Sequence, residues 1–209
     1  MCGFTIKLQK SKNGPSKQTP TNPHTAAINV TNDTFELSFN GFSISAQLAS
    51  NKRSRAYYEK NSGSYTGSFV IVFGWCYAIF GNDPALEEND LKEILSHHRG
   101  NNLAAQLKKL SGQFCLISFD HISGTCWCAG DEWAQHSFYY GANADSLIVS
   151  SRAGIIADNI NAPISGYDYI TRLRGSLYSP GRTLFSGIRR ITCGKALLLD
   201  IPQRSASII

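Results

Sequence analysis

The chain has 209 residues, of which 42% are hydrophobic and 17% are charged, and its formal net charge is +5. This composition predicts a globular protein with enough apolar mass to bury a core. No window approaches the roughly 18 consecutive apolar residues of a membrane helix, and no apolar stretch follows the N-terminal lysines as it would in a secretory signal. We therefore expect one domain over residues 1–209, located in the cytoplasm and without a membrane partner.

The pattern of basic residues argues against a nucleic-acid-binding protein, and the pattern of cysteines argues against a zinc-binding or disulfide-bonded one. The lysines and arginines are scattered rather than interleaved with aromatic residues, which argues against a nucleic-acid partner. The six cysteines form no CxxC pair and no zinc-like spacing with histidines. Cys126 and Cys128 lie two apart in a strand-like run and share a face, so two buried thiols are favoured over a metal site or a disulfide. We expect no metal and no cofactor.

The first part of the chain has the patterns of strands. Residues 3–8 alternate between polar and apolar side chains, and the segment 9–24 is a predicted loop rich in Lys, Ser, Asn, Pro and Gly. Three more strand patterns follow, at 26–30, 34–39 and 42–48.

The most apolar run of the chain is SFVIVFGWCYAIF at 68–80, which follows a polar stretch at 50–64. A continuous apolar run rich in β-branched and aromatic residues predicts a strand that is buried on both faces. Gly74 interrupts this run. An isolated glycine inside a strand indicates a bulge or a close approach of another backbone.

Helix signals come next along the chain. Asp83 and Pro84 resemble a helix start, and Gly100 resembles a stop after His97, His98 and Arg99. Further helices are predicted over 102–110 and 166–175, and further strands over 112–120, 124–130, 136–142, 146–152, 182–191 and 195–201. Strands, central helices and again strands predict a layered α+β domain.

The opening MCGF raises the possibility of a nucleophile at the N-terminus. Removal of Met1 would leave Cys2 with both a thiol and a free α-amine, whose ordinary pKa is near ~7.7–8.0. A thiol beside its own base is an activated nucleophile. The alternative is that Cys2 is an ordinary residue at the start of a strand.

Longer phrases of the sequence resemble a known family. The strand phrase SGQF…D at 111–120, the phrase GD…YY at 130–140 and the close PGRTLFSGIRRI at 180–191 resemble class II glutamine amidotransferases of the asparagine synthetase type, and MCG matches the family's first residues. The resemblance is colinear over nearly the whole chain. It implies the N-terminal-nucleophile hydrolase fold, a four-layer αββα sandwich.

The resemblance also implies residue roles. Cys2 would attack the side-chain amide of glutamine, and Gly74 would offer its backbone N–H to the oxyanion. Phe73 stands where the family has the asparagine of the oxyanion hole. Trp75 stands where the family has a glutamate that binds the substrate, and Asp90 falls near its substrate-binding aspartate. We therefore assign Phe73, Trp75 and Asp90 to substrate binding.

Three functions remain open at this point. The first is hydrolysis of glutamine with supply of ammonia. The second is a non-catalytic scaffold for a separate ATP-dependent synthetase, since no SGG-DS pyrophosphate loop is present in this sequence. The third is a repurposed small-molecule enzyme whose pocket is rebuilt around Phe73 and Trp75, with His24 or His136.

Overall fold

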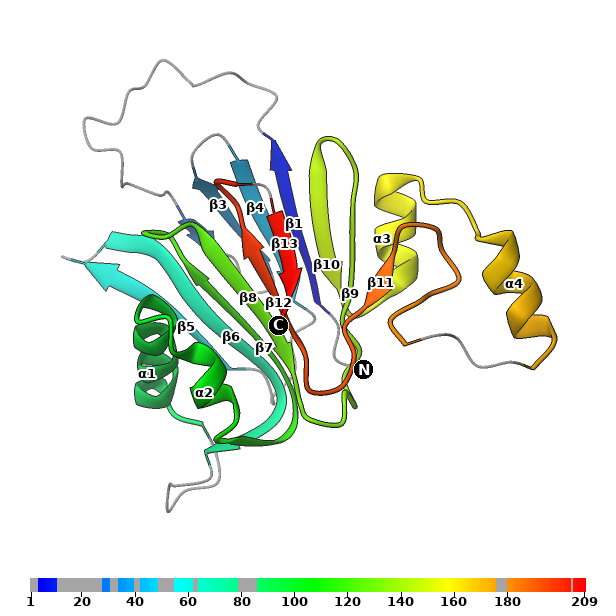
Figure 1. Ribbon diagram of the computed structural model, residues 1–209. Coiled ribbons are helices and arrows are strands. Elements are labelled where there is room, and N and C mark those ends of the chain that lie inside the picture. Colours follow the sequence, from blue (N-terminus) through cyan, green and yellow to red (C-terminus); the bar gives the residue numbers. More distant parts are fainter. Residues whose placement is uncertain are drawn as a thin grey trace.

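The computed structural model describes residues 4–10, 28–30, 34–39, 42–48, 55–61, 64–78, 86–175, 180–203 and 205–209. In these ranges the chain forms two antiparallel sheets and a few short helices (Figure 1). The predicted α+β class is therefore confirmed. None of the described helices is long and apolar enough to cross a membrane.

One sheet, which we call sheet A, places the N-terminal strand at its centre. Its strand order in the described residues is β11-β9-β10-β1-β4-β3-β2. The strands are β1 (Phe4–Lys10), β2 (Ile28–Val30), β3 (Thr34–Phe39), β4 (Phe42–Leu48), β9 (Tyr139–Ala142), β10 (Ser146–Ser150) and β11 (Arg189–Arg190). The strands predicted before residue 50 are all present.

The second sheet, sheet B, contains the long apolar strand. Its order in the described residues is β13-β12-β8-β7-β6-β5. The strands are β5 (Arg55–Asn61), β6 (Ser64–Ala78), β7 (Leu110–Asp120), β8 (Thr125–Gly130), β12 (Ala196–Asp200) and β13 (Ser205–Ile208). The predicted run at 68–80 corresponds to β6, which pairs with β7 over most of its length.

From Phe69 to Phe73 strand β6 is apolar because both of its faces are buried. On one face Phe69, Ile71 and Phe73 belong to the core between the sheets, together with Ile6 of β1 and Val149 of β10. On the other face, residues at alternate positions pack under helices. Continuous apolar runs are expected for strands that are covered on both sides.

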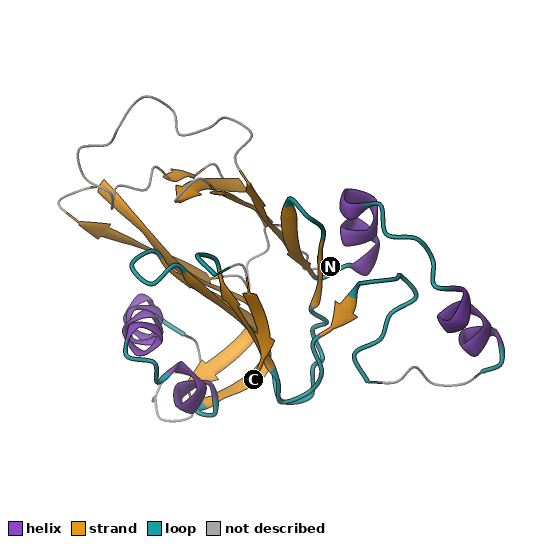
Figure 2. Cartoon of the chain, turned by 45° about the horizontal axis from the view of Figure 1, so that its top comes forward, coloured by secondary structure: helices purple, strands orange, loops and turns teal. Residues whose placement is uncertain are grey.

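Helices cover the other face of each sheet (Figure 2). Helices α1 (Glu88–Arg99) and α2 (Leu103–Leu107) pack on sheet B, where Leu91 of α1 shares a cluster with Val70. Helix α3 (Ala153–Ile160) packs on sheet A, where Ile156 meets Ile148. Burying one such side chain contributes about 1.5–3 kcal/mol.

Helix α4 (Gly166–Leu173) lies apart from both sheets (Figure 1). The side chain of Ser165 caps its N-terminus by accepting a hydrogen bond from the Asp168 N–H. The buried carboxylate of Asp168 pairs with Arg182, with Nε and Oδ1 2.9 Å apart. This contact turns the opposite face of α4 outward, and Tyr167, Ile170 and Leu173 are exposed there.

Two elements differ from the predictions in the central part of the chain. Helix α1 begins at Glu88 with Glu87 as its cap, later than expected, and Asp83 and Pro84 lie outside the described residues. The polar stretch at 50–64 contains strand β5 rather than only a loop. As an edge strand β5 pairs through its backbone and has little need of apolar side chains.

Two further differences lie near the C-terminus. The strand predicted over 182–191 is reduced to β11, because the Thr183 hydroxyl donates to the Ile188 carbonyl and Gly187 adopts φ +75°, which bend this segment into a turn. Helix α3 was not predicted, since its sequence AGIIADNI is short and starts without a capping side chain.

Candidate functional site

Among the glycines whose surroundings are described, Gly74 would meet the closest atom if a Cβ were added. Its φ is +93°, and a Cβ added there would lie 2.2 Å from the Gln113 carbonyl oxygen and 2.8 Å from Nε2 of His136. No side chain fits at 2.2 Å from a backbone oxygen, and the conformation itself favours glycine. The predicted close backbone approach at this position is confirmed.

The remaining predicted site residues are placed to different extents. Cys2 and His24 lie outside the described residues, and so does the side chain of Trp75, whose backbone pairs with Gln113. Phe73 is only 1% exposed and belongs to the core between the sheets. This burial does not place the ring against a substrate, so a direct contact of the Phe73 ring with a substrate stays a prediction.

Asp90 has a structural role in the described chain. Its carboxylate oxygen Oδ2 accepts a hydrogen bond of 2.7 Å from the Glu87 N–H, and the two residues form the capping box of α1. Such a box pairs backbone donors that a helix start leaves without partners. A substrate contact at Asp90 also stays a prediction.

The strand register of sheet A sets an upper limit on the distance between Cys2 and the site around Gly74. Thr5 in β1 pairs with Ser150 in β10, and Ser150 pairs with Tyr139 in β9. Two strand spacings therefore separate Thr5 from Tyr139, a distance of about 10 Å. Tyr139 comes three residues after His136, whose ring touches Gly74. Cys2 comes three residues before Thr5, and three residues span at most about 11 Å.

The cysteines in the described residues form no metal site. Cys115, Cys126 and Cys128 are buried, and none is in a disulfide. A hydrogen bond that the neutral Cys128 thiol makes with Cys126, together with burial, raises the pKa of Cys128 well above its usual range. No group of three or more potential ligands gathers in the described part of the chain. The expectation of two buried thiols is confirmed.

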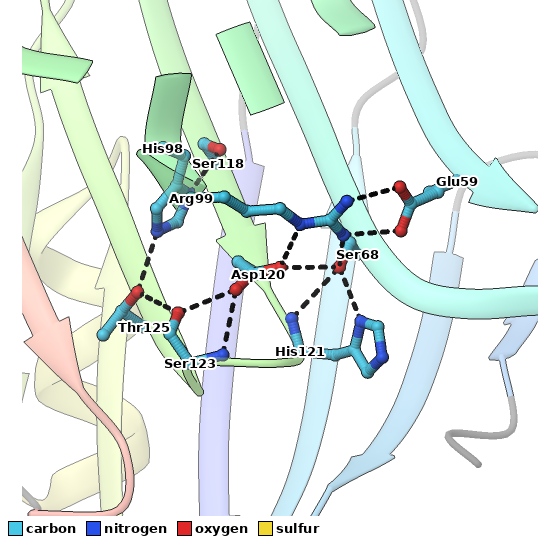
Figure 3. Close-up of polar contacts among 9 residues, drawn as sticks. All are labelled: Glu59, Ser68, His98, Arg99, Ser118, Asp120, His121, Ser123 and Thr125. Atoms are coloured by element: carbon cyan, nitrogen blue, oxygen red, sulfur yellow. Dashed lines mark hydrogen bonds and ion pairs between the residues drawn. The ribbon is translucent and has the colours of Figure 1, made fainter. Parts of the chain in front are cut away.

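A polar cluster lies at the C-terminal end of β7, far from the part of this strand that pairs with Gly74. Asp120 is six residues from Phe114, the partner of Gly74, and thus lies about 20 Å along the strand from it. Figure 3 shows Arg99 of α1 reaching over sheet B to the Asp120 carboxylate, with Nε and Oδ1 2.8 Å apart. Its guanidinium also donates two hydrogen bonds of 2.6 Å to Glu59 of β5.

Every acceptor of the Asp120 carboxylate is used. Oδ1 also accepts from the Ser68 hydroxyl at 3.2 Å, and Oδ2 accepts from the N–H and the hydroxyl of Ser123 at 2.9 and 2.8 Å. The arginine and the Ser123 donors hold the pKa of Asp120 at about 2, although burial raises it. A buried carboxylate with all acceptors satisfied has no lone pair left for a substrate.

His98 belongs to the same cluster. Its Nδ1 lies 2.7 Å from the Ser118 hydroxyl, and its Nε2 lies 2.8 Å from the Thr125 hydroxyl. Burial lowers the pKa of His98 to about 4, so the ring is neutral at pH 7. The cluster fixes the C-terminal end of α1 to strands β5, β6 and β7, and its role is structural.

The cluster predicts a loss of stability in mild acid. The folded-state pKa of His98 is about 4, below the value of about 6.5 expected for the unfolded chain, so only the unfolded chain binds a proton between these values. We expect the free energy of unfolding to fall by about 3 kcal/mol between pH 6.5 and pH 4. Below pH 4, protonation of Asp120 removes further stability.

Urea unfolding of the wild type and of His98→Gln at several pH values measures this effect. Gln does not titrate, so the variant is expected to have a flatter profile between pH 6.5 and pH 4. Equal slopes for both proteins would contradict the assignment to His98. His97→Gln is the control, because the side chain of His97 is 27% exposed and lies on the solvent side of α1.

Two serines carry a signal for this cluster in the sequence. Ser68 and Ser118 are polar residues inside the most apolar strands, and both are completely buried. A polar group in such a position needs a hydrogen-bond partner. His98 and Arg99 had been attributed only to the end of a helix.

Comparison with known proteins gives a fold but no close relative. No family model matches the chain, and no curated protein does. Among solved structures, the glutamine phosphoribosylpyrophosphate amidotransferase of B. subtilis, in complex with ADP and GMP, matches with a TM-score of 0.51 and 7% identity over 99% of this chain. A structure titled as the allosteric regulatory enzyme of purine biosynthesis matches with the same values.

These matches define the fold. This chain shares the fold of the part of these two structures that it matches, one of which is an amidotransferase. It spans about half of the length of both matched chains, since the alignment covers 48% of each. The identity is too low to transfer a substrate, an acceptor or a ligand.

Proposed function

We propose that this chain is a glutamine amidotransferase domain of class II, of the asparagine synthetase type, with Cys2 as its nucleophile. The proposal includes the four-layer αββα arrangement of such domains. Its substrate is glutamine or another small carboxamide, and it needs no metal and no cofactor. The ammonia would serve an ATP-dependent synthetase, which is the proposed partner, in the cytoplasm.

The observation that carries the proposal is the constrained glycine Gly74, which lies against the Gln113 carbonyl and the His136 ring. In sheet A, Thr5 lies about 10 Å from Tyr139, which follows His136 by three residues, and a site shared by Cys2, Gly74 and His136 is compatible with this spacing. Strand β1, which follows Cys2 in the sequence, runs through the middle of sheet A.

The chemistry requires that Met1 is removed. The α-amine of Cys2 then takes the thiol proton, and the thiolate attacks the amide carbon. The carbonyl oxygen gains negative charge, and donors placed at that oxygen stabilise the transition state. Gly74 is proposed to supply one such donor from its backbone.

The second candidate function is a non-catalytic subunit. The observation that favours it is the burial of Phe73, at the position where the resemblance has the asparagine donor. A phenyl ring in the core donates no hydrogen bond to an oxyanion. Such a chain would keep the fold and bind the synthetase without hydrolysing glutamine.

Release of glutamate and ammonia from glutamine distinguishes the two candidates. For the first candidate we expect turnover by the wild type and a loss of at least about 1,000-fold in Cys2→Ala, because removal of a nucleophile leaves only residual catalysis. Cys193→Ala, which alters an exposed thiol, is the control and keeps full activity. Equal background release by all three proteins supports the non-catalytic subunit.

A further inference from the structure

The ring of His136 lies directly against Gly74. A Cβ at Gly74 would come within 2.8 Å of Nε2, so the absence of a side chain at this glycine makes room for the imidazole. The contact joins two segments that are distant in sequence, strand β6 and the loop between β8 and β9.

The loop that carries His136 is built around the carboxylate of Asp131, which is 2% exposed. Oδ1 of Asp131 accepts hydrogen bonds from the N–H groups of Trp133 and Gln135 at 3.0 and 3.1 Å, and Oδ2 accepts from the N–H of His136 at 3.4 Å. Three backbone donors on one buried carboxylate fix the path of the loop. The position of the His136 ring is thus set by the fold.

His136 is also partly exposed, and its ring has no hydrogen-bond partner in the described part of the chain. His136 and Gly74 are both partly exposed, whereas Phe73 and Cys76 of the same strand are buried. The ring nitrogens of His136 make no hydrogen bond with any described residue. A purely structural histidine usually bonds through its ring, as His98 does with Ser118 and Thr125.

We propose that His136 supplies the side-chain donor to the oxyanion in place of the asparagine that this chain lacks. The inference rests on the proposed function, because it requires attack by Cys2 on a carboxamide. Neutral imidazole with its proton on Nε2 donates one hydrogen bond. The donor sits beside Gly74, so the two groups converge on one oxygen from the side chain and from the backbone.

The reaction balances with the groups named. The thiolate forms a C–S bond with the amide carbon, and the carbonyl π electrons move to oxygen, which accepts the hydrogen bond from Nε2 of His136. The carbonyl then re-forms as the C–N bond breaks, and the leaving nitrogen takes the proton from the Cys2 ammonium and departs as ammonia. Water hydrolyses the thioester and regenerates the thiol. His136 donates a hydrogen bond and transfers no proton.

The test compares His136→Ala, His136→Gln and the control His97→Ala, with L-glutamine as substrate. We expect His136→Ala to lower kcat about 100-fold, as for removal of one oxyanion donor, and to change KM by less than about threefold, since the contact forms in the transition state. The amide N–H of Gln reaches a similar position, so His136→Gln recovers most of this loss. His97→Ala keeps the wild-type kcat.

Alkylation of Cys2 by iodoacetamide separates catalysis from folding. This reaction forms no oxyanion, so its rate is expected to be equal in the wild type and in His136→Ala. A kcat of His136→Ala within twofold of the wild type would overturn the role of His136 and leave the proposed function intact. A wild type without any glutamine turnover would overturn the proposed function and, with it, the role of His136.

Discussion

Replacing Asp120 by alanine is expected to lower the free energy of unfolding by about 3–5 kcal/mol, the usual cost of removing one partner from a buried ion pair. The substitution leaves the Arg99 guanidinium with Glu59 and the Ser68 hydroxyl as partners and removes the acceptor of the Ser123 N–H. The hydroxyl of Ser68 loses the same carboxylate. Urea unfolding at pH 7, followed by circular dichroism, measures the difference.

Asp145→Ala is the matched control for this variant. Asp145 is an exposed carboxylate in the turn between β9 and β10, so its loss is expected to change stability by less than about 0.5 kcal/mol. The variant Arg99→Ala and the double variant complete a cycle with Asp120→Ala. Additive effects of Arg99→Ala and Asp120→Ala would contradict a coupled pair.

The second large effect is expected for Gly74→Ala. The new Cβ would lie 2.2 Å from the Gln113 carbonyl oxygen, and φ +93° is unfavourable for alanine. Backbone strain costs about 1–3 kcal/mol, and overpacking costs about 1–3 kcal/mol more. We therefore expect a loss of about 2–6 kcal/mol in the free energy of unfolding, measured by urea titration.

Gly194→Ala separates the two costs of the Gly74 variant. Gly194 has φ +65°, and nothing lies within 4 Å of a Cβ added there. This control therefore reports backbone strain without a steric clash, and we expect it to cost only about 1–3 kcal/mol. If Gly74→Ala were no more destabilising than Gly194→Ala, the close approach of Gln113 to Gly74 would contribute nothing measurable to the free energy of unfolding.

The strands of the two sheets could be predicted because burial leaves a clear pattern in the sequence. The apolar run around Gly74 and the alternation at the N-terminus are signals of this kind. Strand β5 could not be predicted, since an edge strand is held by backbone hydrogen bonds and only Tyr57 and Tyr58 of this strand pack on the core clusters. Its pairing with β6 depends on the sheet rather than on its own sequence.

The site could be predicted only in part. Gly74 could be predicted, because an isolated glycine inside a buried strand indicates a bulge or a close approach of another backbone. The contact of His136 with Gly74 depends on how the loop around Asp131 folds back over β7, and no local pattern contains that information. The role of Asp90 in a helix cap could not be predicted either, because the predicted helix start lies four residues before the observed one.

The central claim is that Cys2 is the nucleophile of a site that accepts glutamine. The most direct measurement is the intact mass of the protein before and after incubation with 6-diazo-5-oxo-norleucine, a glutamine mimic that alkylates such nucleophiles, with Cys2→Ala as control. We predict a chain without Met1 that gains one adduct, and no adduct on Cys2→Ala. A chain that retains Met1, or a processed chain that gains no adduct, would contradict the claim.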